Sequence, residues 1–213
     1  MGVEGVRTPP YRIETERLVI RCYEPRDASL LKEAVDASLD HLRPWMPWAR
    51  FEPQPLEDKA ELLRRFRGEF DLDQNYVYGV FDRAESRQLA GSGLHPRGGP
   101  ASLEIGYFVR ADALRQGLAT EVTAVLTRVA FEVCGVDRVD IQVDPENARS
   151  AGVPRKLGFH QEATLRRRLE PKHDGGPRRD SILFTLVREE LPASGCAAYA
   201  YRAFDAAGAA VGG

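Results

Sequence analysis

The segment Leu114–Glu121, which reads LRQGLATE, has the composition of a turn that binds a phosphate group. Gly117 and Ala119 remove side-chain bulk where the backbone turns into a long helical pattern. The first amides of such a helix have no partner inside it, and the helix dipole adds positive charge there. These amides belong to Gln116, Gly117, Leu118, Ala119 and Thr120. The pattern predicts a pyrophosphate site that is neither a P-loop nor a dinucleotide fingerprint, although alone it also fits a helix that begins with small residues for close packing.

Three further segments accompany this turn. Glu104–Val109 (EIGYFV) is a predicted strand that ends just before it, Asn147–Ser150 (NARS) opens the next predicted helix, and Lys156–Phe159 (KLGF) closes that helix. In this combination the chain resembles the GNAT superfamily of N-acetyltransferases, and specifically its RimJ/RimL-like branch. The resemblance covers roughly residues 15–191, and the segment Trp45–Trp48 (WMPW) also looks like that branch.

The resemblance implies a mixed α/β fold whose largely antiparallel sheet has two splayed middle strands, with acetyl-CoA as co-substrate in the gap. It implies that the backbone of Phe108, Val109 and Arg110 pairs with the pantetheine arm, as an additional strand would. It also implies that residues 116–120 hold the pyrophosphate. Asn147 would contact the pantetheine or the reacting region through its side-chain amide.

Transfer of an acetyl group from a thioester to an amine makes three chemical demands. The amine must lose a proton, the carbonyl oxygen must be stabilised, and the departing thiolate must be neutralised. We expect a backbone N–H near Val109 to stabilise the oxygen, as the resemblance implies. Many family members carry a tyrosine acid in the helix after the NxxS motif, but this chain has Pro154 there. Ser150 is the replacement acid, unless it only satisfies an amide in the first turn of its helix.

The general base stays open at this stage. Some relatives carry a glutamate where this chain has Gln142, which cannot accept a proton. Glu104 is our candidate base because it shares a strand face with Phe108, although strand glutamates are more commonly solvated. Asp144 is a further candidate, unless it only sets the turn before the next helix. Glu170 lies close to where the resemblance places a carboxylate, although an ungapped count puts Leu169 there. Bulk water could also collect the proton.

Two sequence features point to the acceptor side. Trp45 and Trp48 line the acceptor site if their loop forms its roof, or else they anchor that loop to the core. A predicted hairpin carries a basic cluster that would attract an acidic substrate or rRNA, or would simply be a solvated face. This cluster comprises Arg166, Arg167, Arg168, Lys172, His173, Arg178 and Arg179. The four histidines have no ligand spacing, so we expect no metal.

We therefore expect an acetyl-CoA-dependent N-acetyltransferase that acts on a primary amine. The resemblance suggests the α-amine of a protein, a ribosomal protein being the example in that branch. A small amine (polyamine, aminoglycoside or amino acid) is an alternative acceptor, and succinyl is an alternative acyl group. A non-catalytic acyl-CoA sensor is the alternative from another class, favoured by Pro154 and Gln142.

Composition limits the choice of compartment and partner. The 30 basic and 32 acidic residues leave a formal charge of −2, which argues against a general nucleic-acid binder. The three cysteines form neither a disulfide framework nor a metal pattern. No signal peptide or membrane-spanning run is evident, so we expect a cytoplasmic protein that does not bind a membrane. The resemblance also suggests a homodimer.

Periodicity predicts the elements that must position these residues. We expect a flexible arm over residues 1–14, a single domain over 15–191, and a peripheral or partly disordered Ala/Gly-rich tail over 192–213. Within the domain, alternation predicts strands and a 3.6-residue period predicts helices. Strands are predicted at 17–23, 76–82, 88–94, 102–109, 138–143, 160–168 and 181–188, and helices at 27–39, 56–70, 117–134 and 147–157.

Overall fold

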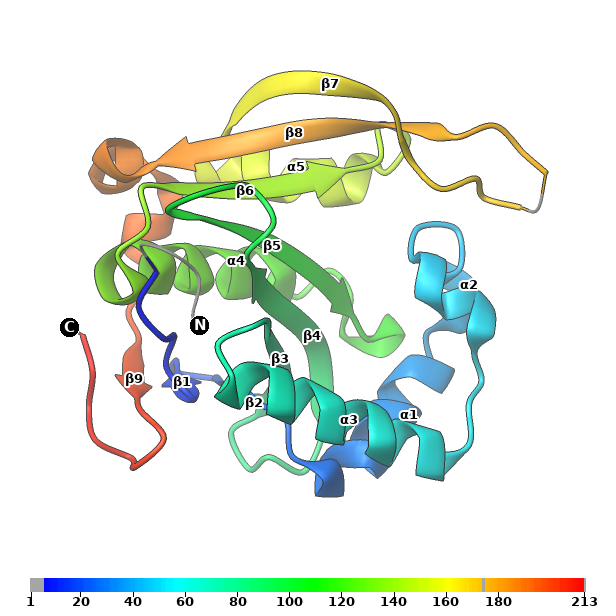
Figure 1. Ribbon diagram of the computed structural model, residues 1–213, viewed down its shortest axis with the longest axis horizontal. Coiled ribbons are helices and arrows are strands. Elements are labelled where there is room, and N and C mark those ends of the chain that lie inside the picture. Colours follow the sequence, from blue (N-terminus) through cyan, green and yellow to red (C-terminus); the bar gives the residue numbers. More distant parts are fainter. Residues whose placement is uncertain (1–5, 174, 213) are drawn as a thin grey trace.

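The computed structural model describes residues 6–173 and 175–212, which form one sheet with helices on both faces (Figure 1). The order of the nine strands is β7-β8-β6-β5-β4-β3-β2-β1-β9, and all neighbours are antiparallel except β5 and β6. This is the mixed, largely antiparallel α/β architecture that the sequence predicts. Across the described ranges, no helix is long and apolar enough to cross a membrane.

The predicted elements between residues 17 and 188 all form, with ends shifted by a few residues. The strands are β1 Arg12–Glu14, β2 Leu18–Cys22, β3 Tyr76–Asp82, β4 Gln88–His95, β5 Ser102–Val109, β6 Arg138–Val143, β7 His160–Leu169, β8 Arg179–Val187 and β9 Arg202–Phe204. The α-helices are α1 Ala28–Asp36, α2 Leu39–Leu42, α3 Leu56–Asp71, α4 Leu118–Val129 and α5 Ala148–Leu157. Short helical turns lie at Pro25–Asp27, Pro47–Phe51, Ala111–Ala113, Ala130–Cys134, Arg188–Ala193 and Gly195–Ala198.

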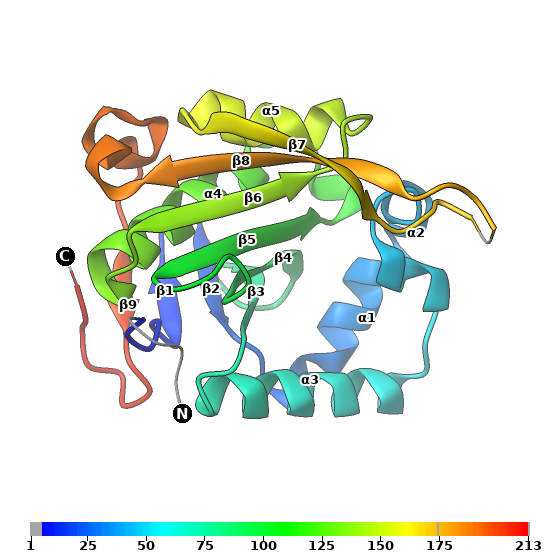
Figure 2. The same cartoon turned by 45° about the horizontal axis from the view of Figure 1, so that its top comes forward.

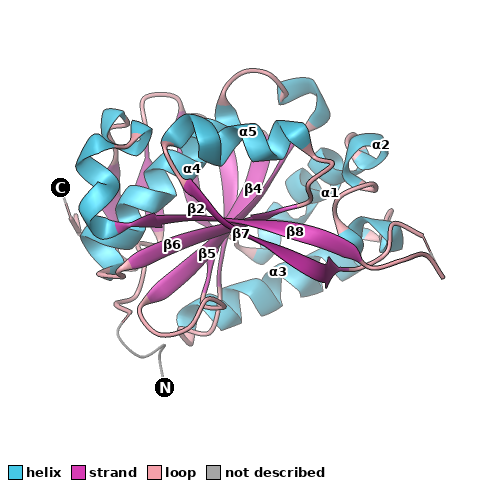
Figure 3. Ribbon diagram, turned by 90° about the horizontal axis from the view of Figure 1, so that it is seen from above, coloured by secondary structure: helices cyan, strands magenta, loops and turns pink. Residues whose placement is uncertain are grey.

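Two hydrophobic clusters hold helices against opposite faces of the sheet (Figure 3). Because successive side chains of a strand point to opposite faces, β2 sends Leu18 and Ile20 into the larger cluster and Val19 into the smaller one. The larger cluster includes Leu126 of α4, and the smaller one includes Leu63 of α3. The alternation in β2 therefore explains how one short strand serves both layers.

The parallel pair β5 and β6 separates part-way along its length, as Figure 1 shows. Only three register pairs join the two strands, and the last of them is Glu104 with Asp140. Beyond this point β5 stays paired with β4 as far as Val109, and β6 stays paired with β8 as far as Val143. A gap therefore opens in the middle of the sheet, between two halves that each keep a continuous ladder.

The two chain ends differ from the sequence prediction. Residues 1–5 of the predicted flexible arm lie outside the described residues, but Arg12–Glu14 is the strand β1 and pairs with both β2 and β9. The predicted tail supplies β9 and the fully buried Cys196. Each of these strands has only three residues, which is too short for alternation to be recognised in the sequence. The ends complete the sheet instead of extending from it.

We predict that Ile13→Ala lowers the free energy of unfolding by about 2–5 kcal/mol, because Ile13 is 0% exposed and its replacement leaves a cavity. Chemical denaturation of the purified protein measures this difference. Leu72→Ala is the control, since Leu72 is 63% exposed and should change stability by no more than about 0.5 kcal/mol. Equal, small effects of both substitutions would mean that β1 does not belong to the folded core.

Candidate active site

The turn that leads into α4 presents a row of main-chain donors. Gly117 is the N-cap of α4 and has φ +76°, a left-handed conformation that favours glycine. Among the described residues, the first amide of this turn with a protein acceptor is that of Glu121, which donates to the Gly117 carbonyl at 3.0 Å. None of the described residues accepts a hydrogen bond from the amides of residues 116–120. This is the geometry of an anion-binding helix N-terminus.

Side chains from the connection between β1 and β2 fix this turn in place. The buried Glu121 carboxylate accepts hydrogen bonds from Thr15 Oγ1 at 2.7 Å and from Arg17 Nε at 2.6 Å. A second nitrogen of Arg17 donates to the Gln116 carbonyl at 3.0 Å. The sequence reasoning assigned no role to Thr15 or Arg17, because their partner is about 100 residues away along the chain. Both are positioning residues for the turn.

Every second residue of β5 points its main-chain N–H and C=O groups into the gap between β5 and β6. The Arg110 amide donates to the Leu89 carbonyl at 2.8 Å, so the main chain at Arg110 faces β4. Because main-chain groups alternate along a strand, Phe108 also faces β4, whereas Tyr107 and Val109 face the gap. Of the three residues expected to pair with a pantetheine arm, Val109 alone therefore turns its amide to the gap.

Val109, the last residue of β5, and Arg110, which follows it, make different contacts. The Val109 carbonyl lies 2.9 Å from His41 Nε2, which ties α2 to the end of the strand. The Arg110 guanidinium is buried and bonds Glu33 at 2.7 Å and Asp112 at 3.1 Å. Arg110 therefore holds α1 against the strand, while the N–H of Val109 stays available to a ligand in the gap.

A pair of hydroxyls lies at the N-terminus of α5. Asn147 caps this helix, because its Oδ1 accepts a hydrogen bond from the Ser150 amide at 3.1 Å. Tyr107 Oη donates to the Ser150 carbonyl at 3.0 Å and lies 3.1 Å from Ser150 Oγ. Burial raises the pKa of Tyr107 to about 12, so its hydroxyl stays protonated. The sequence reasoning noted that Pro154 displaces the usual tyrosine but missed Tyr107, whose only signal was its place in the EIGY segment.

Glu104 lies at the point where the two strands separate. Its Oε2 accepts a hydrogen bond from Gln142 Nε2 at 2.9 Å, and its Oε1 lies 3.6 Å from the Arg97 guanidinium. Burial raises the pKa of Glu104 above the usual value for a glutamate, against the opposing effects of Gln142 and Arg97. The structure thus joins the candidate base Glu104 to Gln142, which the sequence analysis did not connect.

The two other carboxylates considered as bases are held in ion pairs. Asp144 is buried against Arg179, and Glu170 pairs with Arg50 at 2.9 Å. Asp144 also accepts a hydrogen bond from the Glu146 amide at 2.8 Å, which fixes the turn before α5. These contacts account for both residues without a catalytic role.

A cleft of about 610 Å³ passes through the gap and connects the two faces of the sheet. On the face toward α5 it is lined by Tyr107, Asn147 and Ser150. On the other face it is lined by the tryptophan loop, which contributes Trp45, Met46, Trp48 and Phe51. Trp48 packs edge-on against Phe108 with ring centroids 5.7 Å apart, and it is 38% exposed. The Trp45 ring lies under Lys172 Nζ at 4.6 Å. Both tryptophans line the cleft and both also pack against neighbours, which fits the roof and the anchor interpretations alike.

Comparison with known proteins agrees with this geometry. The family model described as acetyltransferase (GNAT) domain matches residues 17–160. The chain belongs to the GNAT acetyltransferase family. It is 24% identical over 178 residues to the uncharacterized N-acetyltransferase YoaA of Bacillus subtilis (strain 168), covering 83% of this chain and 96% of that protein. It is 25% identical over 160 residues to the [ribosomal protein uS5]-alanine N-acetyltransferase of Escherichia coli (strain K12), covering 72% and 80%.

Solved GNAT structures share the fold. The RimJ protein of Mycobacterium smegmatis, determined in complex with CoA-disulfide, superposes with a TM-score of 0.77 at 24% identity, over 90% of this chain and 95% of that one. The family resemblance and the enzyme class inferred from the sequence are confirmed. This GNAT enzyme transfers the acetyl group of acetyl-CoA to an amine nitrogen.

We predict that Gly117→Asp reduces the affinity for CoA by at least about 100-fold, because it puts a carboxylate beside the diphosphate and costs several kcal/mol in like-charge repulsion. Isothermal titration of the free enzyme with CoA measures the dissociation constant. Gly208→Asp is a matched control: Gly208 has φ +80° against +76° for Gly117, and it has open space around it. Equal losses in both variants, or no loss in either, would remove the turn from the CoA site.

Proposed function

We propose that the acceptor of this N-acetyltransferase is the α-amine at the N-terminus of a protein. One observation carries the proposal: the cleft continues into a second hollow of about 620 Å³, and the two share Trp45, Met46 and Phe51 in their linings. The second hollow lies between the tryptophan loop and the β7–β8 hairpin, which reaches over α2 (Figure 2). A small amine would fill only the cleft, whereas a peptide needs a path outward for the residues that follow the first.

The protonation chemistry of the site supports the same acceptor. An α-amine has a pKa near 8, so about a tenth of it is already neutral at pH 7, whereas a lysine side chain has a pKa near 10.4. Asp144 and Glu170 are committed to ion pairs, and Glu104 is engaged by Gln142. A site with little free carboxylate suits an amine that gives up its first proton to bulk water.

The E. coli relative is named for acetylating the alanine of ribosomal protein uS5, which agrees with this class. The proposal includes a cytoplasmic location, where protein N-termini are made.

The residues present fit a CoA thioester, because the free amides of 116–120 match a diphosphate and the gap beside β5 leaves room for an extended arm. When bound, acetyl-CoA supplies the activated acetyl group. In our proposal the Val109 N–H donates a hydrogen bond to the carbonyl oxygen as negative charge develops on it. Asn147 orients the arm through the side-chain nitrogen that its capping role leaves available.

The hydroxyl pair serves the departing sulfur in this proposal. Ser150 Oγ donates its hydrogen to the developing thiolate, and the Tyr107 hydroxyl turns its single hydrogen from the Ser150 carbonyl to Ser150 Oγ. On the other face of β5, the Glu104 carboxylate attracts the ammonium form of the acceptor. Acetylation by direct transfer then needs no covalent enzyme intermediate.

The acceptor class is tested with a panel of amines. We expect a peptide of four residues to have a kcat/KM at least about 10-fold above that of the same N-terminal amino acid alone, because the second hollow binds the following residues. Thiol release from acetyl-CoA measures the rates. Equal rates for the peptide and the amino acid would favour a small-molecule acceptor, and Nε-acetylation of lysine in preference to the N-terminus would contradict the proposal.

A matched pair of surface variants locates the peptide. Phe51→Ala should raise the KM for the peptide several-fold and leave the amino acid unaffected, because Phe51 lines both hollows. Leu72→Ala is the control, since both side chains are 63% exposed but Leu72 lines neither hollow. An unchanged KM for Phe51→Ala would place the peptide elsewhere.

We predict that Ser150→Ala lowers kcat by about 10- to 100-fold and leaves the dissociation constant of CoA unchanged, because the donor acts only on the developing thiolate. Helix α5 keeps its cap, since Asn147 bonds the Ser150 amide and not its side chain. Steady-state kinetics and CoA titration provide the two readouts. Ser150→Thr retains a hydroxyl and should recover much of the rate, whereas a Ser150→Ala enzyme with wild-type kcat would show that the serine is only structural.

A further inference from the structure

The side chain of His95, at the end of β4, occupies a slot made by two glycines. Gly93 and Gly106 are cross-strand partners on β4 and β5. A Cβ atom at Gly93 would lie 2.6 Å from His95 Nε2, and one at Gly106 would lie 3.6 Å from the same atom. The imidazole therefore lies across this glycine pair and leans back along β4, toward the open end of the gap. His95 and Gly106 both line the cleft.

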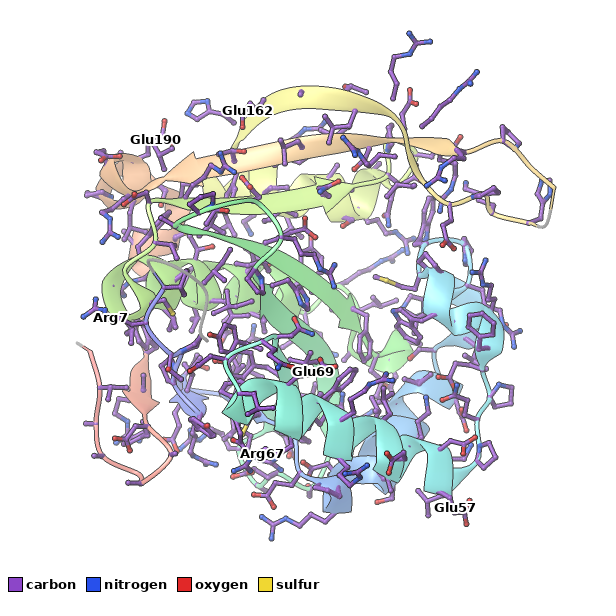
Figure 4. All side chains as sticks on the ribbon, viewed as in Figure 1. Arg7, Glu57, Arg67, Glu69, Glu162 and Glu190 are labelled. Carbon is purple, nitrogen blue, oxygen red and sulfur yellow. The ribbon has the colours of Figure 1, made fainter. Side chains whose placement is uncertain are left out.

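A chain of hydrogen bonds fixes the tautomer of this imidazole. Asn75 Nδ2 donates to the Glu69 carboxylate at 3.1 Å, and because a carboxylate only accepts, the amide oxygen of Asn75 must point the other way. That oxygen lies 2.6 Å from His95 Nδ1, so Nδ1 carries the hydrogen and donates it. The lone pair is then on Nε2, for which the described residues provide no hydrogen-bond partner. Glu69 lies near the end of α3 opposite to Glu57 (Figure 4).

The surroundings keep His95 neutral. Burial, with a smaller contribution from the Arg97 guanidinium, lowers the pKa of His95 to about 4. Further charged groups near the ring are Glu69 on α3, its ion-pair partner Arg65 at 3.8 Å, and Glu104, the register partner of His95 on β5. Across the range in which enzymes usually work, the Nε2 lone pair is available to accept a hydrogen bond or a proton.

The position of the ring places it within reach of the reacting nitrogen through water. Nε2 lies level with Gly106, three residues before Val109, and a strand rises about 3.3 Å per residue. The separation along the strand is thus about 10 Å, which a chain of about three water molecules bridges. His95 lies on the face that receives the acceptor, opposite to the face on which Tyr107 and Ser150 meet.

We propose that His95 Nε2 accepts, through water in the cleft, the proton that the acceptor nitrogen loses as its bond to the acetyl carbon forms, and that Asn75 and Glu69 are positioning residues that hold the ring for this purpose. This inference rests on the proposed acceptor site.

The proposed step balances as follows. The neutral amine forms the C–N bond and the C–S bond breaks. One proton passes from nitrogen by way of water to Nε2. The sulfur gains one proton from Ser150, and Ser150 regains one from solvent. His95 then returns its proton to solvent through the open cleft. A nitrogen that is forming a bond to an acyl carbon is a strong acid, so a base of low pKa is sufficient. Glu104, beside the ring, stabilises the transient imidazolium.

Kinetics of matched histidine variants test the proposal. His95→Phe keeps a planar ring and His95→Gln keeps a hydrogen-bond acceptor, but neither can take up a proton. Both should lower kcat at pH 7 by at least about 10-fold and leave the dissociation constant of CoA unchanged. The deficit should shrink from pH 7 to pH 9 as hydroxide replaces the lost base. His160→Phe is the control, because His160 is an exposed histidine on β7 away from the cleft.

Nitrogen NMR of the free enzyme gives a readout that does not depend on activity. At pH 7 the His95 ring should be neutral with its hydrogen on Nδ1, and Asn75→Ala should convert it to a mixture of tautomers. A wild-type ring protonated on Nε2, or a His95→Phe enzyme with kcat within two-fold of wild type, would overturn the inference. A pH-independent deficit would also overturn it, because that is the signature of structural damage. A wild type that is inactive on peptides but active on other amines would instead overturn the proposed acceptor, and the variants would then be compared on the amine that it uses.

Discussion

The interruption of pairing between β5 and β6 is the constraint on which the site depends. After Glu104 and Asp140 the two strands stop bonding each other, so the main chain of Val109 faces a gap and not a neighbouring strand. A buried main-chain group without a partner costs about 1–3 kcal/mol, so such a gap is tolerated only where water or a ligand enters. The cleft through the sheet meets this condition. Pairing of β4 with β5 and of β6 with β8 keeps each half of the sheet rigid while the gap stays open.

The connection between the splayed strands explains why two helix N-termini serve the same site. The chain runs from β5 through α4 to β6 and then to α5, and β5 and β6 are parallel. Helices that follow parallel strands begin at the carboxyl ends of those strands, which is the edge where ligands bind in such sheets. The free amides of α4 and the capped serine of α5 are thereby brought to the side on which the gap opens. A ligand that spans both can use the dipole of one helix and the hydroxyl of the other.

The sequence was sufficient where a function is encoded by neighbouring residues. The turn at Gly117 and the first turn after Asn147 are local patterns, and the structure has the left-handed glycine and the helix cap there. The predicted strands and helices between residues 17 and 188 were long enough to show a period, whereas the four-residue helix α2 and the three-residue strands β1 and β9 were not. Element type was therefore predictable, and the membership of the two chain ends in the sheet was not.

Residues whose role depends on a partner far away along the chain could not be identified from the sequence. Tyr107 meets Ser150 across 43 positions, and His95 is oriented by Asn75 across 20. Neither spacing follows a helical or strand period, so no pattern could join them. Asp144 shows the same limit: the turn that it sets is visible in the local sequence, but its ion pair with Arg179 of β8 is not. Tertiary contacts determine which polar residue is available for chemistry.

The alternation of β5 separates the proton transfers of the reaction. An ammonium nitrogen carries three hydrogens and the amide product carries one, so two protons leave the nitrogen, while the sulfur gains one. Odd positions of β5, such as Tyr107, face α4 and α5, and even positions, such as Glu104, face the acceptor side. The groups that we propose as donors to sulfur and those that we propose as acceptors of protons from nitrogen therefore lie on opposite faces of one strand, with the gap between them. This separation allows a donor such as Ser150 to remain protonated while His95 remains unprotonated, although only the thickness of the sheet divides them.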